Sequence, residues 1–210
     1  MKKKTKEIIE ILRQEYPDAK CELNHKTSFQ LLVATILSAQ TTDKSVNKVT
    51  ETLFEDYPTV EEFLTLSQQE IESKIKRLGL YRNKAKNLYT MVRVLQEKFN
   101  GQVPSNMIDL QTLAGVGRKT ANVVLSNAFD VPAIAVDTHV FRVSNRIGIV
   151  KAKNVLETEK QLQKEIDKNL WTLTHHLIIF HGRRCCEAKK PKCDRCPINK
   201  NCNYFKKIIK

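Results

Sequence analysis

Signals for helices run through almost the whole chain and signals for strands hardly appear, which restricts the fold more than any other feature. Apolar residues recur at helical spacing near the N-terminus and again over 88–99, ahead of the helix-ending pair Asn100-Gly101. Pairs typical of capping boxes open three other helices: Thr27 with Gln30, Thr59 with Glu62, and Ser67 with Glu70, whose helix Gly79 would end. Further helices are expected near 138–147, 154–167 and 170–182, after a short extended segment, "VPAIAVD". The pattern predicts an all-α chain with short connections.

The chain carries a large excess of positive charge. Its 210 residues include 36 Lys and Arg against 23 Asp and Glu, which gives a net charge of +13. Some of this charge lies at the two ends, but the body remains basic without it, and this favours a polyanionic partner such as nucleic acid. The longest nearly apolar run, "LLVATILSA" at 31–39, is too short to cross a bilayer. We therefore expect a soluble, cytoplasmic protein, associated with the nucleoid and without a membrane partner.

Four cysteines close together predict a metal site near the C-terminus. Cys186, Cys193, Cys196 and Cys202 follow the spacing C-x6-C-x2-C-x5-C. Spacing alone leaves open whether tetrahedral zinc or an iron–sulfur cluster is bound, because both accept four cysteines. Cys185 could compete with Cys186 for the first ligand position but is expected to be a spectator. The five histidines show no spacing typical of ligands and are expected in core or surface positions. Basic side chains around the cysteines, Lys190 among them, suggest that the metal holds a rigid basic loop against DNA.

A glycine turn at 113–124, "LAGVGRKTANVV", is the second motif. Gly115 and Gly117 are suited to positive backbone angles in a tight turn between two helices. The first N–H groups of the second helix would then face a phosphate, although an ordinary helix–helix corner would have the same pattern. Arg118 and Lys119 stand at the start of that helix, where the macrodipole disfavours cations.

Lys119 and Asp137 form a candidate catalytic pair. The helix dipole and the neighbouring Arg118 disfavour the ammonium form of Lys119, and a partly neutral amine is a nucleophile. A plain phosphate-binding lysine is the alternative. Asp137 begins the helix "DTHVFRVSNR" and is either its N-cap or, if Thr138 caps, a carboxylate free to face a cleft. An amine with a nearby carboxylate can displace a leaving group from a sugar carbon.

Together these motifs resemble the endonuclease III family of helix-hairpin-helix DNA glycosylases and apurinic-site lyases. The resemblance covers essentially the whole chain, and the three motifs follow in the family's order and spacing. It implies two helical lobes with DNA in a cleft between them: a six-helix barrel over 21–132 that contains the hairpin, and a second lobe formed by 1–20 and 133–210. It also implies a four-iron four-sulfur cluster on Cys186, Cys193, Cys196 and Cys202, in a loop over 186–202.

The resemblance also assigns roles to single residues. Lys119 would attack the sugar of an oxidised pyrimidine and lead to cleavage 3′ to the abasic site, while Asp137 would stabilise positive charge on the sugar. The residues expected at the DNA are Gln40, which would fill the gap left by the flipped base; Leu80, which would wedge the opposite strand; Gly115, Gly117 and Arg118; His139; and Lys190. The purely structural alternatives are that Gln40 is a polar residue at a helix C-terminus and that Leu80 is a hydrophobic staple at a helix end. We expect a monomer that binds double-stranded DNA with a damaged base or an abasic site.

Three rival functions deserve comparison. The adenine glycosylase that acts on oxidised-guanine mispairs shares the hairpin and the cluster loop, but it needs a glutamate where this chain has "ILSAQTTD", and it carries a further C-terminal domain. A DNA-binding module or redox sensor without glycosylase chemistry would be expected to lack Lys119 or Asp137. A structural zinc protein would be colourless, whereas an iron–sulfur protein is brown.

Overall fold

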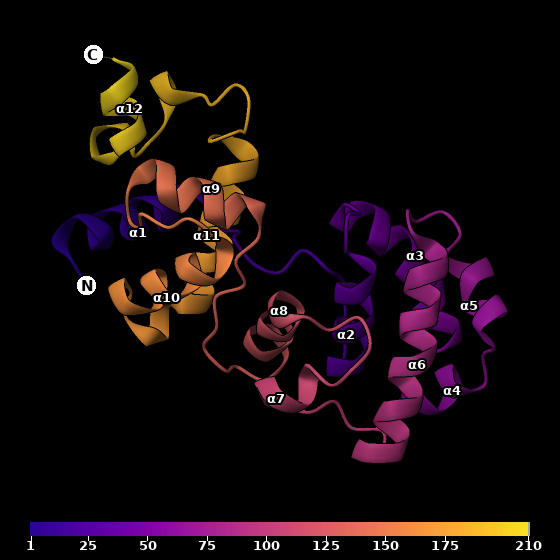
Figure 1. Cartoon of the computed structure of the whole chain (residues 1–210). Coiled ribbons are helices and arrows are strands. Elements are labelled where there is room, and N and C mark those ends of the chain that lie inside the picture. Colours follow the sequence, from indigo (N-terminus) through magenta and orange to yellow (C-terminus); the bar gives the residue numbers. More distant parts are fainter. Residues whose placement is uncertain (210) are drawn as a thin grey trace. The chain divides into compact units, whose positions relative to one another are not determined.

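The structure is a computed structural model that describes residues 1–209, and every regular element within them is helical (Figure 1). This confirms the all-α prediction. Contacts between Cα atoms divide the chain into two compact units. One is the continuous segment Cys21–Val131, and the other combines Met1–Lys20 with Pro132–Lys210.

The Cys21–Val131 unit is built around one almost entirely buried helix. Its helices are α2 (Ser28–Leu37), α3 (Asp43–Asp56), α4 (Val60–Leu64), α5 (Gln68–Ile75), α6 (Tyr81–Phe99), α7 (Met107–Leu110) and α8 (Arg118–Ala128). In α2, every residue from Phe29 to Leu37 is buried, and the helix packs against α3, α6 and α8. Since an apolar helix needs cover on all sides, α2 forms the centre of this unit and the amphipathic helices surround it.

Local capping explains where most of these helices begin. The reciprocal capping boxes of Thr59 with Glu62 and Ser67 with Glu70 are present as predicted. Thr27 also caps α2, but the side chain of Gln30 accepts its hydrogen bond from the backbone of Lys26, so the reciprocal half of that box is wrong. The expectation that Gly79 ends α5 is wrong as well. The helix ends at Ile75, and a turn closed by the Leu78 N–H on the Ile75 carbonyl at 2.9 Å follows it.

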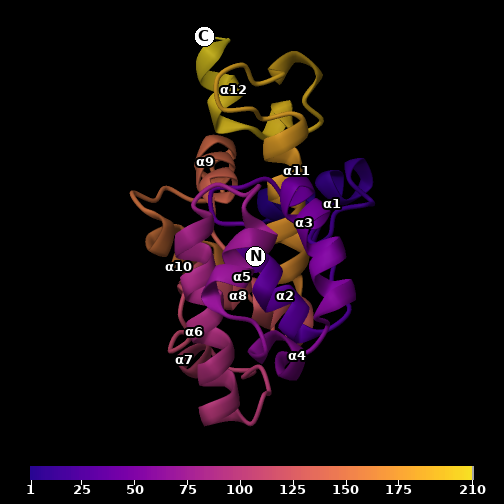
Figure 2. The same cartoon turned by 90° about the vertical axis from the view of Figure 1, so that its right-hand side faces the viewer.

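The other unit brings the two ends of the chain together. Its helices are α1 (Lys3–Glu15), α9 (Thr138–Ile147), α10 (Val155–Glu165), α11 (Trp171–Arg184) and α12 (Asn203–Ile208), with 3-10 turns η1 (Lys168–Leu170), η2 (Cys193–Arg195) and η3 (Asn199–Asn201). Helix α11 packs against both α1 and α9, over a core that includes the fully buried Ile8, Val143 and Ile178. Figures 1 and 2 both place the segment after α11 at one end of α9 and α11.

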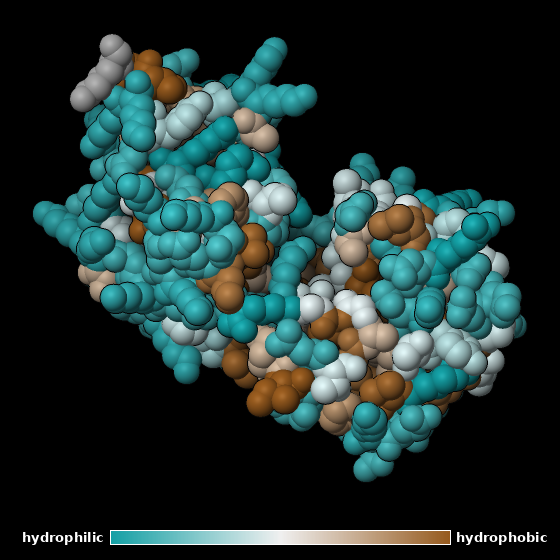
Figure 3. Space-filling model, in the orientation of Figure 1, coloured by the Kyte–Doolittle hydropathy of each residue, from teal (hydrophilic) through white to brown (hydrophobic). Residues whose placement is uncertain are grey.

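The surface of each unit is mainly polar. Figure 3 shows hydrophilic side chains over most of the visible face, including the end formed by the segment after α11. No helix within residues 1–209 combines the length and the apolar character that a membrane span requires.

Candidate functional site

The glycine turn joins α7 to α8 and requires glycine at one of its two positions. Gly115 has φ +79°, and a Cβ atom there would lie 3.1 Å from Asn87 and 3.2 Å from Ile36. Gly117 differs from the prediction, because its backbone is extended, with φ −88° and ψ 178°. The reason is its place as the N-cap of α8, a position that has extended rather than left-handed backbone. The turn therefore needs one left-handed residue, not two.

The start of α8 is open to an anion. Gly117 has no side chain, so the first N–H groups of α8 receive no side-chain cap. Arg118 and Lys119 are both exposed beside them. Within the part of the chain that the structure describes, no hydrogen bond or ion pair occupies the ammonium group of Lys119. The arrangement offers backbone donors for a phosphate and an accessible amine at one helix end.

Asp137 is the N-cap of α9, and Thr138 is the first residue of the helix. Oδ1 of Asp137 accepts a hydrogen bond from the N–H of Val140 at 2.8 Å, and Oδ2 of Asp137 lies 3.1 Å from Nδ1 of His139. The idea that Thr138 caps and releases the carboxylate is therefore wrong. Asp137 can nonetheless both cap α9 and present a carboxylate at the surface, because its side chain keeps 16% of its surface exposed while its two oxygens are held in place. His139 packs closely on Gly182, where an added Cβ would lie 3.1 Å from His139 Cβ.

Gln40 and Leu80 share an unusual backbone. They have φ +53° and +59°, in the left-handed region that residues with side chains rarely adopt. Gln40 is exposed and lies two residues beyond Ser38, the C-cap of α2, while Leu80 precedes α6 with 56% of its surface exposed. A helix-end staple would bury Leu80, so this alternative does not describe it. Such strained residues tend to occur at functional sites.

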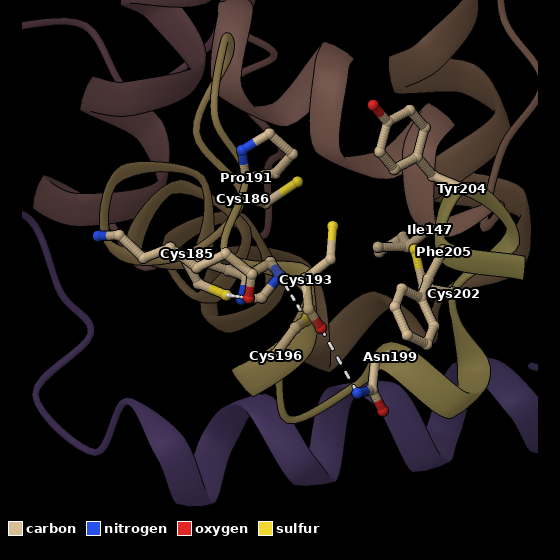
Figure 4. Close-up of a pocket in the computed structure, with 12 residues that line it drawn as sticks. Ile147, Cys185, Cys186, Pro191, Cys193, Cys196, Asn199, Cys202, Tyr204 and Phe205 are labelled. Carbon is tan, nitrogen blue, oxygen red and sulfur yellow. Dashed lines mark hydrogen bonds between the residues drawn. The ribbon is translucent and has the colours of Figure 1, made fainter. Parts of the chain in front are cut away.

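The cysteines line one pocket in the segment after α11. In Figure 4 the sulfur atoms of Cys186, Cys193 and Cys202 face the same open space, and Cys185 and Cys196 also line the pocket. Sγ of Cys185 lies 3.7 Å from the carbonyl oxygen of Lys192. The donor set fits a metal centre that accepts thiolates, either an iron–sulfur cluster or zinc.

His181 is a residue of this centre that spacing did not reveal. Its side chain is 1% exposed, and its Nε2 lies 3.7 Å from Sγ of Cys196. Ligand atoms of His181, Cys185 and Cys196 all lie within 4.8 Å of one another, so this trio is a second possible ligand set. The core position expected for the histidines fits the buried His181, but its contact with Cys196 was not foreseen, and a ligand role is now an alternative to the spectator role expected for Cys185. The contacts arise when α11 packs against the segment that follows it.

Hydrogen bonding fixes how His181 faces the sulfur. Burial lowers the pKa of His181 to about 4, so the ring is neutral near pH 7. Its Nδ1 lies 3.0 Å from the Tyr16 hydroxyl, and burial raises the pKa of Tyr16, which keeps that hydroxyl protonated. The Tyr16 hydroxyl therefore shares a hydrogen bond with Nδ1, and Nε2 of the neutral ring faces Sγ of Cys196. Tyr16, just beyond α1, thus orients the His181 ring toward a candidate metal ligand.

The buried thiols need a cation to ionise. Burial raises the pKa of Cys196 to about 12 and also raises that of Cys193. Metal binding must therefore displace protons from these sulfurs, which couples occupancy of the site to folding of the segment.

Two arginines of α9 hold the cysteine segment from outside. Nη2 of Arg142 donates to the Cys186 carbonyl at 3.1 Å. Arg146 donates to the carbonyls of Glu187 and Ala188 at 2.7 and 2.8 Å. These contacts leave Lys190 exposed at the surface of the segment.

The expected site residues fall into two groups. Gln40, Leu80, Gly115, Gly117, Arg118 and Lys119 belong to the Cys21–Val131 unit; Asp137, His139, Lys190 and the four cysteines belong to the other. Within the first unit, Gly117, Arg118 and Lys119 adjoin one helix end. Within the second, Asp137 and His139 make one contact, and the cysteines line one pocket.

Comparison with known proteins gives consistent matches. The family model described as "HhH-GPD superfamily base excision DNA repair protein" matches residues 33–168. The chain is 50% identical over 193 residues to endonuclease III of Bacillus subtilis (strain 168), covering 91% of this chain and 88% of the relative. It is 45% identical over 207 residues to endonuclease III of Escherichia coli (strain K12), covering 99% and 98%. The solved structure of a trapped endonuclease III–DNA covalent intermediate matches all of both chains with a TM-score of 0.93 and 48% identity.

Proposed function

The chain belongs to the HhH-GPD superfamily of base excision DNA repair proteins, and from this premise we propose how its own residues carry out the reaction. The protein is a DNA glycosylase with lyase activity that acts on duplex DNA, and we assign it oxidised pyrimidines as substrates. The observation that supports this best is the exposed Lys119 beside the open start of α8, because an accessible amine next to a phosphate-binding helix end can reach a deoxyribose carbon.

Lys119 is the proposed nucleophile. After the damaged base is flipped out of the stack, the neutral amine attacks C1′, and the bond from C1′ to the base breaks. The bonding electrons leave with the base, which takes up a proton, while the amine loses one. Opening of the sugar ring then gives a protonated imine between Lys119 and C1′. The imine acidifies the C2′ proton, and its removal expels the 3′ phosphate by β-elimination.

Asp137 is proposed to act electrostatically on the same nucleotide that Lys119 attacks. Its carboxylate stabilises the positive charge that develops on the sugar as the base leaves, and it assists proton transfer. The two hydrogen bonds to Val140 N–H and His139 fix the carboxylate before substrate binds. His139 acts here by orienting Asp137. Gln40 fills the gap left by the flipped base, and Leu80 inserts as a wedge into the opposite strand.

We propose a four-iron four-sulfur cluster as the metal centre, held by Cys186, Cys193, Cys196 and Cys202. When bound, the cluster supplies cross-links that fix the backbone of the segment 186–202. The chain's own residues then present Lys190 and its basic neighbours to DNA phosphates.

The covalent step can be tested directly. Borohydride added to a mixture of the protein and duplex DNA with one oxidised pyrimidine should reduce the imine and give a covalent adduct. Undamaged duplex of the same sequence is the control and should give none. If the iron-containing, DNA-binding protein gives no adduct with any oxidised pyrimidine, the assigned chemistry is wrong.

Replacing Asp137 with asparagine should separate catalysis from folding. Asparagine caps a helix as well as aspartate does, so the free energy of unfolding should change by less than about 0.5 kcal/mol. Loss of the charge should slow single-turnover base excision by roughly 10²–10³-fold. Alanine is the comparison variant, because it also removes the cap and should destabilise the protein by about 1 kcal/mol. Excision at the wild-type rate by Asp137→Asn would exclude the electrostatic role.

Reversing the charge of Lys190 should weaken DNA binding independently of sequence. Each lost phosphate contact reduces the slope of log affinity against log salt by about 0.9, so Lys190→Glu should give a shallower slope by about one. The measurement is binding to duplex with a stable abasic analogue over a range of salt concentrations. Lys168→Glu in η1 is the matched control, since Lys168 is also exposed in the same unit. Equal slopes for Lys190→Glu and the wild type would remove this segment from the DNA interface.

A further inference from the structure

Lys84 is a buried cation that the proposed reaction does not use. It lies in α6 with 3% of its surface exposed, and among the Lys and Arg residues of 1–209 it is the one that is buried. Lysine is almost never fully buried unless it has a partner, because an ammonium group loses its hydration there. Burial accordingly lowers the pKa of Lys84. A costly group in such a place calls for a structural or functional reason.

The partner of Lys84 is the turn that carries Gln40. Nζ of Lys84 donates to Oγ1 of Thr41 at 2.6 Å, across 43 residues of sequence. The same Oγ1 lies 3.3 Å from the carbonyl oxygen of Ala39, to which it donates. The Thr41 N–H closes the turn on the carbonyl of Ser38 at 3.1 Å. Gln40, with φ +53°, thus lies between residues that are held by hydrogen bonds. Of these bonds, the one from Lys84 comes from a distant helix, α6.

Lys84 is also tied to the turn that carries Leu80. Its backbone N–H donates to the Leu80 carbonyl at 3.0 Å, which is the first helical hydrogen bond of α6. Leu80 has φ +59° and an exposed side chain. One residue therefore joins the two left-handed, exposed residues of this unit that we assign to the opened duplex. Left-handed residues of this kind persist only where the surrounding contacts enforce them.

We propose that Lys84 is a positioning residue that holds the Gln40 turn and the Leu80 turn in a fixed relation, so that both side chains enter the opened duplex together. The proposal rests on the proposed function, from which the roles of Gln40 and Leu80 are taken. Lys84 acts through the backbone of these turns and does not touch the reacting atoms. The buried charge serves here to specify one conformation of an exposed turn.

Three variants test the proposal. Lys84→Met keeps the length and the apolar stem but removes the donor, and Thr41→Val removes the acceptor with the same shape. Lys86→Met removes an exposed ammonium from the same helix and is the matched control. If Lys84 and Thr41 act through their hydrogen bond, the double variant should show no larger effect than Thr41→Val alone, because Thr41→Val already removes the bond to Lys84 together with the bond to the Ala39 carbonyl.

The first readout needs neither substrate nor cluster. Hydrogen exchange of the Thr41 amide in the free protein should become at least about tenfold faster in Lys84→Met and Thr41→Val, and stay unchanged in Lys86→Met. Unchanged exchange in the first two variants would overturn the proposal, since Lys84 would not hold the turn.

The second readout is the state of the DNA. A 2-aminopurine base opposite a stable abasic analogue should become fluorescent when the wild type binds and unstacks it. In Lys84→Met the fluorescence increase at saturating protein should fall to less than half of the wild-type increase. The fold decrease in kcat for excision should be about ten times the fold increase in KM. Faster exchange with a normal fluorescence increase would show that the turn is loosened but not needed for insertion, and this too would overturn the proposal. Hydrogen exchange and 2-aminopurine fluorescence can both be measured even if the wild type fails to excise oxidised pyrimidines, so failure of the proposed function is seen separately.

Discussion

Replacing Lys119 with glutamine is expected to abolish base excision, strand cleavage and borohydride adducts together. Glutamine has no nucleophilic nitrogen, and loss of a covalent nucleophile lowers turnover by at least about 10⁴-fold. Binding to duplex with an abasic analogue should fall by only a few-fold, because Lys119 is one of 36 basic residues and the N–H groups at the start of α8 remain. Single-turnover excision, adduct yield and binding affinity are the three measurements.

The control for Lys119→Gln is Lys98→Gln, which removes one exposed charge from the C-terminal turn of α6 in the same unit. It should leave excision unchanged. If Lys119→Gln lost affinity and activity to the same degree, Lys119 would be a phosphate contact and the nucleophile would be another group. If excision survived and only the adduct disappeared, the glycosylase step would use water, and Lys119 would serve the lyase step alone.

Replacing Cys196 with alanine is expected to remove the metal centre and unfold the segment 186–202. The regular structure in this segment consists of two three-residue 3-10 turns, η2 and η3, which cannot hold it together alone. Purified wild-type protein should be brown and contain about four iron and four sulfide per chain if it holds the proposed four-iron four-sulfur cluster. Cys196→Ala should be colourless, and protease should cleave it rapidly in the basic stretch around Lys190. Iron content, sulfide content and limited proteolysis are the measurements.

Cys185→Ala is the matched control for Cys196→Ala, because it removes a neighbouring buried thiol that is not among the four cysteines we assign to the cluster. It should retain iron and colour. Loss of the metal in Cys185→Ala with retention in Cys193→Ala would instead select the trio His181, Cys185 and Cys196. Zinc in place of iron in the wild type would contradict the assignment of an iron–sulfur cluster, whichever cysteines bind it.

Local rules were sufficient to predict much of the fold. Helical periodicity and the capping boxes at Thr59 and Ser67 depend on residues within one turn of each other, so the sequence displays them directly. The errors at Gly79 and Gly117 have a common source. A glycine marks a place where the chain can turn, but the neighbouring hydrogen bonds decide which backbone angles it adopts.

The parts of the site that the sequence did not reveal depend on contacts between distant residues. The Tyr16 hydroxyl meets His181 across 165 residues, and Lys84 meets Thr41 across 43. Neither pair forms a motif, because only the packing of α1 on α11 and of α2 on α6 brings the partners together. For Asp137, by contrast, the sequence predicted the position but not the hydrogen bonds. Its place at a helix start was clear, but the division of its two oxygens between cap and His139 required coordinates.

The order of the units along the chain has a consequence for biosynthesis. Helix α1 (Lys3–Glu15) is synthesised well before the helix on which it packs, α11 (Trp171–Arg184). The continuous segment Cys21–Val131 contains all of its own core and can fold while translation continues, whereas α1 must wait for most of the chain. During this interval the apolar face of α1, with Ile8, Ile9 and Leu12, is without its partner. The nascent chain is therefore exposed to chaperones and proteases at α1 until α11 is made, and a chain truncated before α11 should contain a folded Cys21–Val131 segment with α1 unfolded.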